Sequence, residues 1–97
     1  NGSVRGSVLF AGVCVEEGAL IEDSVIMPNT TVKAGAIIRR AIVAENCVIG
    51  ENAIVGAEMG DIALIGQDTQ LPANYTVSAG DQVDTDIINK REAEAHE

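Results

Sequence analysis

Residues 4–54 read VRGSVLFAGVCVEEGAL, IEDSVIMPNTTVKAGAI and IRRAIVAENCVIGENAI when they are written as three consecutive blocks of 17. Aliphatic residues recur within each block at steps of five, six and six, without a break. We call these residues openers, because each one begins a third of a block. They are Val4, Leu9, Val15, Ile21, Ile26, Val32, Ile38, Val43, Ile49 and Val55. An amphipathic helix would repeat at three and four, and a single amphipathic strand at two. The pattern instead predicts a triangular coil of three short strands, a hexapeptide β-helix.

The turn positions of the repeat support this coil. Gly or Asn occupies all six positions of two equivalent corners, and both residues tolerate the positive φ of a tight corner. The six are Gly12, Asn29 and Asn46 at one corner and Gly18, Gly35 and Asn52 at the other. The third corner is short and reads Arg5-Gly6-Ser7, Glu22-Asp23-Ser24 and Arg39-Arg40-Ala41. Since stacked coils lie about 4.8 Å apart, residues 17 apart are expected to be ladder neighbours.

A second inward-facing residue is expected four positions after each opener, where three walls converge and space is limited. Most of these residues are small: Val13, Ala19, Thr30, Ala36, Cys47 and Ala53. On the short side we expect the larger Val8, Val25 and Ile42 to stack on one another.

The register slips after Val55. Residues 56–64 (GAEMGDIAL) are too long for one face and are predicted to form a protruding loop. The six-residue step resumes at Ile65, Leu71, Val77 and Val83, with Thr69 and Tyr75 as second inward residues. We therefore expect one β-helix domain over residues 1–88, with four to five coils between residues 4 and 83. Residues 89–97 are predicted to be a charged tail, either a frayed helix or disordered.

Composition limits the classes of partner. The chain has 97 residues, enough for one domain, and a formal net charge of -9. Nucleic acids and anionic membrane surfaces call for clustered Lys and Arg, so neither is an expected partner. The chain has no apolar run near 18 residues and no signal peptide, which predicts a soluble, cytoplasmic protein.

The two cysteines are predicted to be free thiols. Cys14 and Cys47 fall at non-equivalent positions about two coils apart, roughly 10 Å by the strand spacing. This separation exceeds the reach of a disulfide. We expect Cys47 to be a small inward hydrophobe and Cys14 a rim thiol, as in a reducing compartment.

No catalytic or metal-binding set can be assembled from these residues. His96 lies in the tail, far from both cysteines, so neither a Cys-His nor a Ser-His-Asp arrangement is predicted. One His and two separated Cys do not form a metal-ligand set. The carboxylates fall at corners and loops, where a solvated role is expected. We predict no catalytic residue and no metal ligand in this chain.

Arg39 and Arg40 form the one charged constellation of interest. They lie on the short corner, beside Glu22 and Asp23, with Arg5 one coil further on. One interpretation is a charge ladder, Arg5–Glu22–Arg39, that relieves like-charge stacking between coils. The other is an anion site, because guanidinium groups bind phosphate through paired hydrogen bonds. The residues leave both interpretations open.

Three stretches carry a family resemblance: SVLF at Ser7–Phe10, DSVIMP at Asp23–Pro28 and RRAIVAENCVIGENAIVG at Arg39–Gly56. With the short third side, they resemble the C-terminal domain of bacterial glucose-1-phosphate adenylyltransferase, or ADP-glucose pyrophosphorylase, over residues 2–89. The resemblance implies a left-handed β-helix. It also implies a parent enzyme of glycogen synthesis that converts ATP and glucose-1-phosphate to ADP-glucose and pyrophosphate with Mg²⁺. The catalytic domain that uses Mg²⁺ lies outside these residues, so we expect a C-terminal fragment without a cofactor of its own.

The resemblance further implies partners. In that family the β-helix packs against the catalytic domain, builds subunit contacts in a homotetramer and helps form an allosteric site for phosphorylated sugar effectors. The positions that match its basic effector region are Arg39 and Arg40. A catalytically weak regulatory paralogue shares this helix, and the tail after Asn89 matches no family motif.

Two rival functions stay open. One is a hexapeptide-repeat acyltransferase that uses an acyl-CoA, which needs a His base that no coil supplies. The other is a purely structural trimerisation module.

Overall fold

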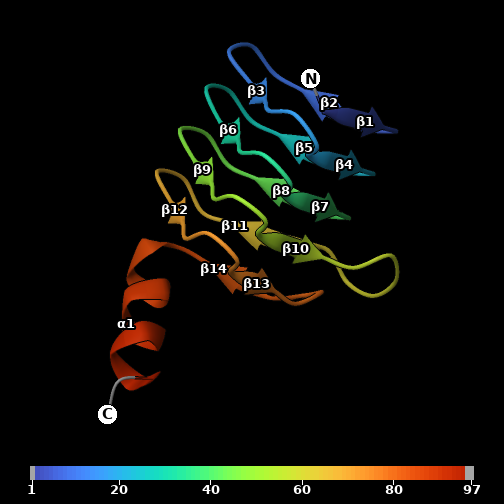
Figure 1. Ribbon diagram of the computed structural model, residues 1–97. Helices are drawn as coiled ribbons and strands as arrows, with labels where there is room; N and C mark the ends of the chain where they lie inside the picture. Colours follow the sequence, from blue (N-terminus) through green and yellow to red (C-terminus); the bar gives the residue numbers. More distant parts are fainter. Residues whose placement is uncertain (1, 96–97) are drawn as a thin grey trace.

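The computed structural model describes residues 2–95, which form fourteen short strands and one C-terminal helix (Figure 1). The strands are β1 (Ser3–Arg5), β2 (Val8–Leu9), β3 (Cys14–Val15), β4 (Leu20–Glu22), β5 (Val25–Ile26), β6 (Thr31–Val32), β7 (Ile37–Arg39), β8 (Ala41–Val43), β9 (Val48–Ile49), β10 (Ile54–Gly56), β11 (Ala63–Ile65), β12 (Gln70–Leu71), β13 (Thr76–Val77) and β14 (Gln82–Val83). The helix is α1 (Thr85–Ala95).

The strands form three parallel sheets, one for each wall of a triangular prism. Their orders are β1-β4-β7-β10-β13, β2-β5-β8-β11-β14 and β3-β6-β9-β12. Within the first wall, Val4 pairs with Ile21 and Ile21 with Ile38, so successive coils are in register at a separation of 17. The chain is thus an all-β parallel solenoid of about five turns, as the repeat predicts.

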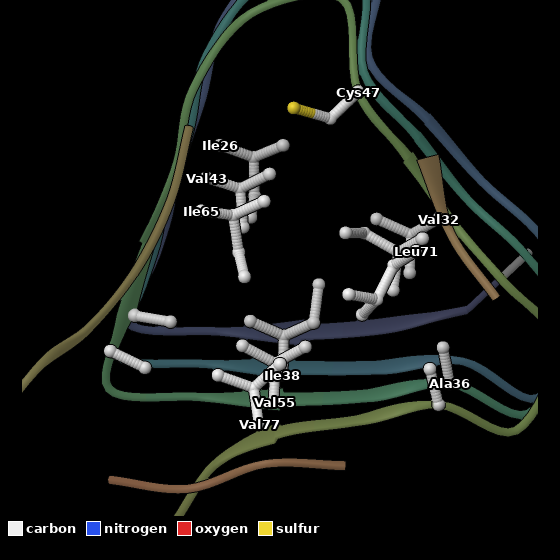
Figure 2. Close-up of a cluster of buried hydrophobic side chains, with 14 of the residues drawn as sticks. Ile26, Val32, Ala36, Ile38, Val43, Cys47, Val55, Ile65, Leu71 and Val77 are labelled. Carbon is white, nitrogen blue, oxygen red and sulfur yellow. The ribbon is translucent and has the colours of Figure 1, made fainter. Parts of the chain in front are cut away.

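The openers fill the interior of the prism. Figure 2 shows their side chains in columns, one from each wall, with Cys47 in the corner between two of them. The labelled columns are Ile26, Val43 and Ile65, then Ile38, Val55 and Val77, then Val32 and Leu71. The predicted stack of Val15, Val32 and Ile49 is confirmed by the pairing of their strands. Burying these aliphatic stacks is the main source of stability in such a fold.

The prediction for the short side was wrong about which way its larger residues face. Val8, Val25 and Ile42 do stack on one another, but on the outside of the prism. The inward positions belong instead to Ser24 and Ala41, only three residues after their openers. The physical reason is a one-residue turn, which shifts the inward–outward alternation by one. That turn residue has positive φ in each of the first three coils: Gly6, Asp23 and Arg40.

The protruding loop lies between β10 and β11 and extends sideways from the coils (Figure 1). It covers residues 57–62 and is shorter than predicted, because both of its ends join the sheets. Gly56 pairs with Arg39, and Ala63 pairs with Ala41. After the loop Thr69 is fully buried and Tyr75 packs against the core, as expected for second inward residues.

The C-terminal helix departs from the predicted boundaries. The last strand ends at Val83 and α1 begins at Thr85, so the expected domain boundary at residue 88 falls inside the helix. The backbone N–H of Ile87 donates to Asp84 Oδ1 over 2.9 Å, which is an N-cap contact that favours this start. The predicted tail is helical to Ala95, and residues 96–97 lie outside the described part. Within residues 2–95 no helix has the length and apolarity to span a membrane.

Candidate functional site

The short corner brings the predicted charged residues together. β1, β4 and β7 end at Arg5, Glu22 and Arg39, and the strand pairing places these three residues directly above one another. The turn residue follows each of them. The site is therefore a stack of three equivalent corners on one edge of the prism.

Glu22 links the two neighbouring arginines. Its Oε1 accepts a hydrogen bond from Arg39 Nε at 2.9 Å, and its Oε2 lies 3.7 Å from an Arg5 guanidinium nitrogen. Arg39 also lies 3.9 Å from a carboxylate oxygen of Glu58 in the protruding loop. These contacts confirm the charge-ladder interpretation. Pairs at the surface contribute at most about 1 kcal/mol each, so the ladder mainly aligns the coils and neutralises Arg39.

Arg40 is held differently from Arg39. Its Nε donates to the carbonyl of Gly60 at 3.3 Å, and its own carbonyl accepts from the N–H of Ala63 at 3.1 Å. Among residues 2–95 no carboxylate lies within ion-pair distance of its guanidinium group. Within the described residues Arg40 is therefore the arginine of this corner that has no ion pair, and the base of the loop packs beside it.

The cysteines take the positions predicted for them. Both are free; Cys14 is exposed and Cys47 is buried. The Cys47 thiol donates to the carbonyl of Gly66 over 3.0 Å, and burial raises its pKa above the ordinary value. A buried thiol with a raised pKa is a poor nucleophile. Within the described residues no group of His, Cys, Asp or Glu is arranged to hold a metal ion, and His96 lies outside them.

Two apolar surfaces lie outside the charged corner, and the repeat pattern did not assign residues to either of them. The first is the outer column formed by Val8, Val25 and Ile42, which leads into an open groove of about 220 Å³ beside α1. The groove is lined by Ile42, Leu64, Ile65, Gly66, Gln82, Val83, Asp84 and Ile87. The one-residue turn at the short corner determines that these residues face outward. The sequence does carry a signal for this turn, because the third corner is short in all three blocks.

The second surface is the rim of the first coil. Val4 and Leu9 are openers, yet 41% and 38% of their surfaces are exposed, whereas their successors Ile21 and Ile26 are fully buried. Phe10 is 43% exposed on the same coil. The difference arises because the strands of the first coil lie at the ends of their sheets. An apolar rim of this kind is typical of a contact surface.

A family model described as GlmU-like, C-terminal hexapeptide matches residues 1–81. The chain belongs to the GlmU-like C-terminal hexapeptide family. This assignment identifies the solenoid as a left-handed β-helix built from hexapeptide repeats, a domain type associated with transferases. The match is not specific to glucose-1-phosphate adenylyltransferase. No curated protein and no solved structure matches the chain.

Proposed function

We propose that this chain is the non-catalytic C-terminal domain of a glucose-1-phosphate adenylyltransferase. The observation that carries the proposal is the placement of its three family-like stretches. Ser7–Phe10, Asp23–Pro28 and the start of Arg39–Gly56 all begin at the short corner and continue onto the wall of β2, β5 and β8. Residues that are far apart in sequence thus make one continuous surface.

Two contacts of this domain with the rest of the enzyme belong to the proposal. The rim of the first coil, with exposed Val4, Leu9 and Phe10, suits packing against the nucleotidyltransferase domain. The outer column of Val8, Val25 and Ile42 suits a subunit contact within a homotetramer. Both surfaces are apolar, so association would bury area that is now in water.

The effector role falls mainly on Arg40. Its guanidinium keeps donors available for the phosphate of a sugar phosphate, whereas Arg39 is held by Glu22. Arg39 contributes by fixing the corner and by adding positive potential. The Mg²⁺ that this reaction needs belongs, in this proposal, to the nucleotidyltransferase domain.

The test uses the full-length protein that contains this chain. We expect it to form ADP-glucose and pyrophosphate from ATP and glucose-1-phosphate, and to be activated by phosphorylated sugars. Arg40→Ala should raise the activation midpoint about tenfold, because one charge-assisted hydrogen bond is worth about 1.5–3 kcal/mol. Turnover without effector should stay unchanged. Arg5→Ala removes an exposed arginine from the same edge and is the matched control.

Two results would count against the proposal. Absence of ADP-glucose synthesis would reject the parent enzyme. An activation midpoint that does not move in Arg40→Ala would leave the corner as a structural ladder only.

The second candidate is acyl transfer, which the family assignment keeps open. Residues 2–95 contain no histidine to serve as a general base, which speaks against it. The check is direct: the chain is incubated with acetyl-CoA and an amino sugar phosphate, and free CoA thiol is measured. Release of CoA that depends on the acceptor would favour this candidate over the first.

A further inference from the structure

The protruding loop takes the place of a turn at the charged corner. In each of the first three coils one residue makes this turn: Gly6, Asp23 and Arg40. In the fourth coil residues 57–62 stand at the same position, because Gly56 pairs with Arg39 before the loop and β11 pairs with β8 after it. Figure 1 shows the loop projecting between β10 and β11. The insertion therefore lies directly beside the two arginines of the corner.

The loop presents one oxygen acceptor to each arginine. Glu58 Oε1 lies 3.9 Å from a terminal nitrogen of Arg39. The carbonyl oxygen of Gly60 accepts a hydrogen bond from Arg40 Nε over 3.3 Å. A phosphate group would offer oxygen acceptors to the same guanidinium groups. The loop thus places acceptors of its own on donors that a bound anion would use.

Two glycines allow the loop to approach the corner this closely. Gly56 has a φ of 77°, and a Cβ at this position would overlap the carbonyl oxygen of Arg39. Gly60 has a φ of 110°, and a Cβ there would lie 3.0 Å from the Cβ of Ala79. Both conformations are accessible to glycine without steric cost. The contacts with the arginines therefore depend on the backbone of the loop as well as on its side chains.

Glu58 is held less firmly than the other glutamate of the corner. Glu22 accepts a hydrogen bond from Arg39 over 2.9 Å, and its side chain is 23% exposed. The Glu58 side chain is 75% exposed and makes the longer contact. An exposed ion pair of this kind adds little to stability, so Glu58 can leave Arg39 while Glu22 stays. An anion within reach of both arginines would lie near the Glu58 carboxylate and be repelled by it.

We propose that Glu58 is an internal competitor of the anion that binds Arg40. This inference rests on the effector role proposed above for Arg40 and adds how the affinity of that site is set. In the absence of an anion, Glu58 neutralises Arg39 and the Gly60 carbonyl engages Arg40. A phosphate group displaces both acceptors, so the loop loses these two contacts with the corner. The charge of Glu58 lowers the affinity of the site, and binding frees the loop.

The test measures the binding of inorganic phosphate to the full-length protein by isothermal titration calorimetry at constant ionic strength. Binding at this corner is defined as the part that Arg40→Ala removes. Glu58→Gln removes the charge and keeps the shape of the side chain. We expect it to lower the Kd of this part about fivefold, because one repulsive charge near the anion is lost.

Asp61→Asn is the matched control, because it removes the same charge from the same loop. The Asp61 side chain lies against Gly80, and within the described residues it makes no ion pair with either arginine. We expect Asp61→Asn to change the Kd by less than about twofold, since salt screens charges that are not in contact.

A second readout follows the loop itself. The side chain of Met59 is 83% exposed, so a fluorescent amino acid can replace it without disturbing the corner. Phosphate should lower the fluorescence anisotropy at this position in the wild-type background, as the loop is freed. In Arg40→Ala phosphate should leave the anisotropy unchanged.

The sign of the change in Glu58→Gln decides the proposal. Unchanged or weaker phosphate binding would overturn it, because a residue that only supports the site does not oppose the anion. An equal gain in Asp61→Asn would overturn it as well, and so would an anisotropy that phosphate does not alter. Each of these results leaves the effector role of Arg40 in place as long as Arg40→Ala weakens phosphate binding. If Arg40→Ala binds phosphate as the wild type does, the effector role and this proposal are both rejected, and ADP-glucose synthesis still tests the parent enzyme separately.

Discussion

Arg40 combines an unusual backbone with the charge that matters most for the proposed function. Its φ is 47°, in the left-handed region, where Gly6 stands at the equivalent corner of the first coil. A non-glycine residue in this region costs of order 1–3 kcal/mol. Backbone hydrogen bonds to the neighbouring coils hold Arg40 in this conformation. Its N–H donates to the carbonyl of Glu22, and its carbonyl accepts from the N–H of Ala63. An arginine at such a corner suggests that its side chain has a use.

The backbone cost can be measured separately from the side chain. Arg40→Gly and Arg40→Ala both remove the guanidinium, but only glycine adopts positive φ freely. We expect Arg40→Gly to be more stable than Arg40→Ala by about 1 kcal/mol in urea unfolding. At Arg39, whose φ is not positive, the order should reverse by about 0.5–1 kcal/mol. A glycine variant that is the weaker at both positions would disprove the strain at Arg40.

Substitution of Ile38 measures how much one core residue contributes to stability. It is fully buried between Ile21 and Val55 in one column. Ile38→Ala should lower the free energy of unfolding by about 2–5 kcal/mol, through lost burial and a cavity. Ile54→Ala is the control, because Ile54 faces outward on the same wall. A loss at Ile38 no larger than the loss at Ile54 would contradict the assignment of inward columns.

At the scale of elements, α1 depends on contacts outside itself. Its apolar contacts come from the adjacent Ile87 and Ile88, and the described side chains from Asn89 to Glu94 are exposed. A short helix with so little apolar surface is unstable alone in water. Its position therefore relies on the first turn and on the clamp between Asp81 and Arg91.

The clamp predicts a pH dependence. The hydrogen bonds from Arg91 hold the pKa of Asp81 below its ordinary value, so the folded state favours the charged carboxylate. This contribution is fully present above about pH 4, the range of an unfolded Asp, and is lost as the pH falls through the lower folded pKa. We expect the protection of α1 amides from hydrogen exchange, corrected for intrinsic rates, to fall as the pH is lowered from about 4 through the folded pKa of Asp81.

Asp81→Asn is the control for the clamp. It should show reduced protection at the higher pH and little further change on acidification. Equal losses on acidification in the wild type and in Asp81→Asn would assign the effect to other carboxylates.

At the scale of the whole molecule, the two ends of the prism differ. The net charge of -9 makes two copies of the chain repel each other. The first coil has free strand edges and partly exposed openers, and the last coil is covered by α1. We expect the chain to self-associate at high concentration through its uncovered apolar surfaces.

Salt should strengthen this association, because it screens repulsion between like-charged copies. Light scattering at about 50 mM and about 500 mM NaCl should show a larger mass at the higher salt. Val4→Lys should weaken the association if the first coil contributes. A monomeric mass at every concentration and salt would refute the expectation.

The sequence by itself determined the coil, its three walls and the inward columns that the openers form. This was possible because the contacts of a solenoid repeat at a constant separation of 17, so a local spacing such as Ile21 to Ile38 already encodes a long-range pair. The ladder of Arg5, Glu22 and Arg39 was predicted from the same separation of 17 residues.

Only the tertiary structure decided the features that depart from the repeat of 17 residues. The outward direction of Val8, Val25 and Ile42 depends on a turn of one residue, and the positive φ of that turn at Arg40 is not a preference of arginine. The docking of α1 depends on an uncovered prism end that buries Ile88, and its helical propensity alone does not predict that contact. The free charge of Arg40 depends on where the loop returns to the sheet, which puts Gly60 rather than a carboxylate beside it.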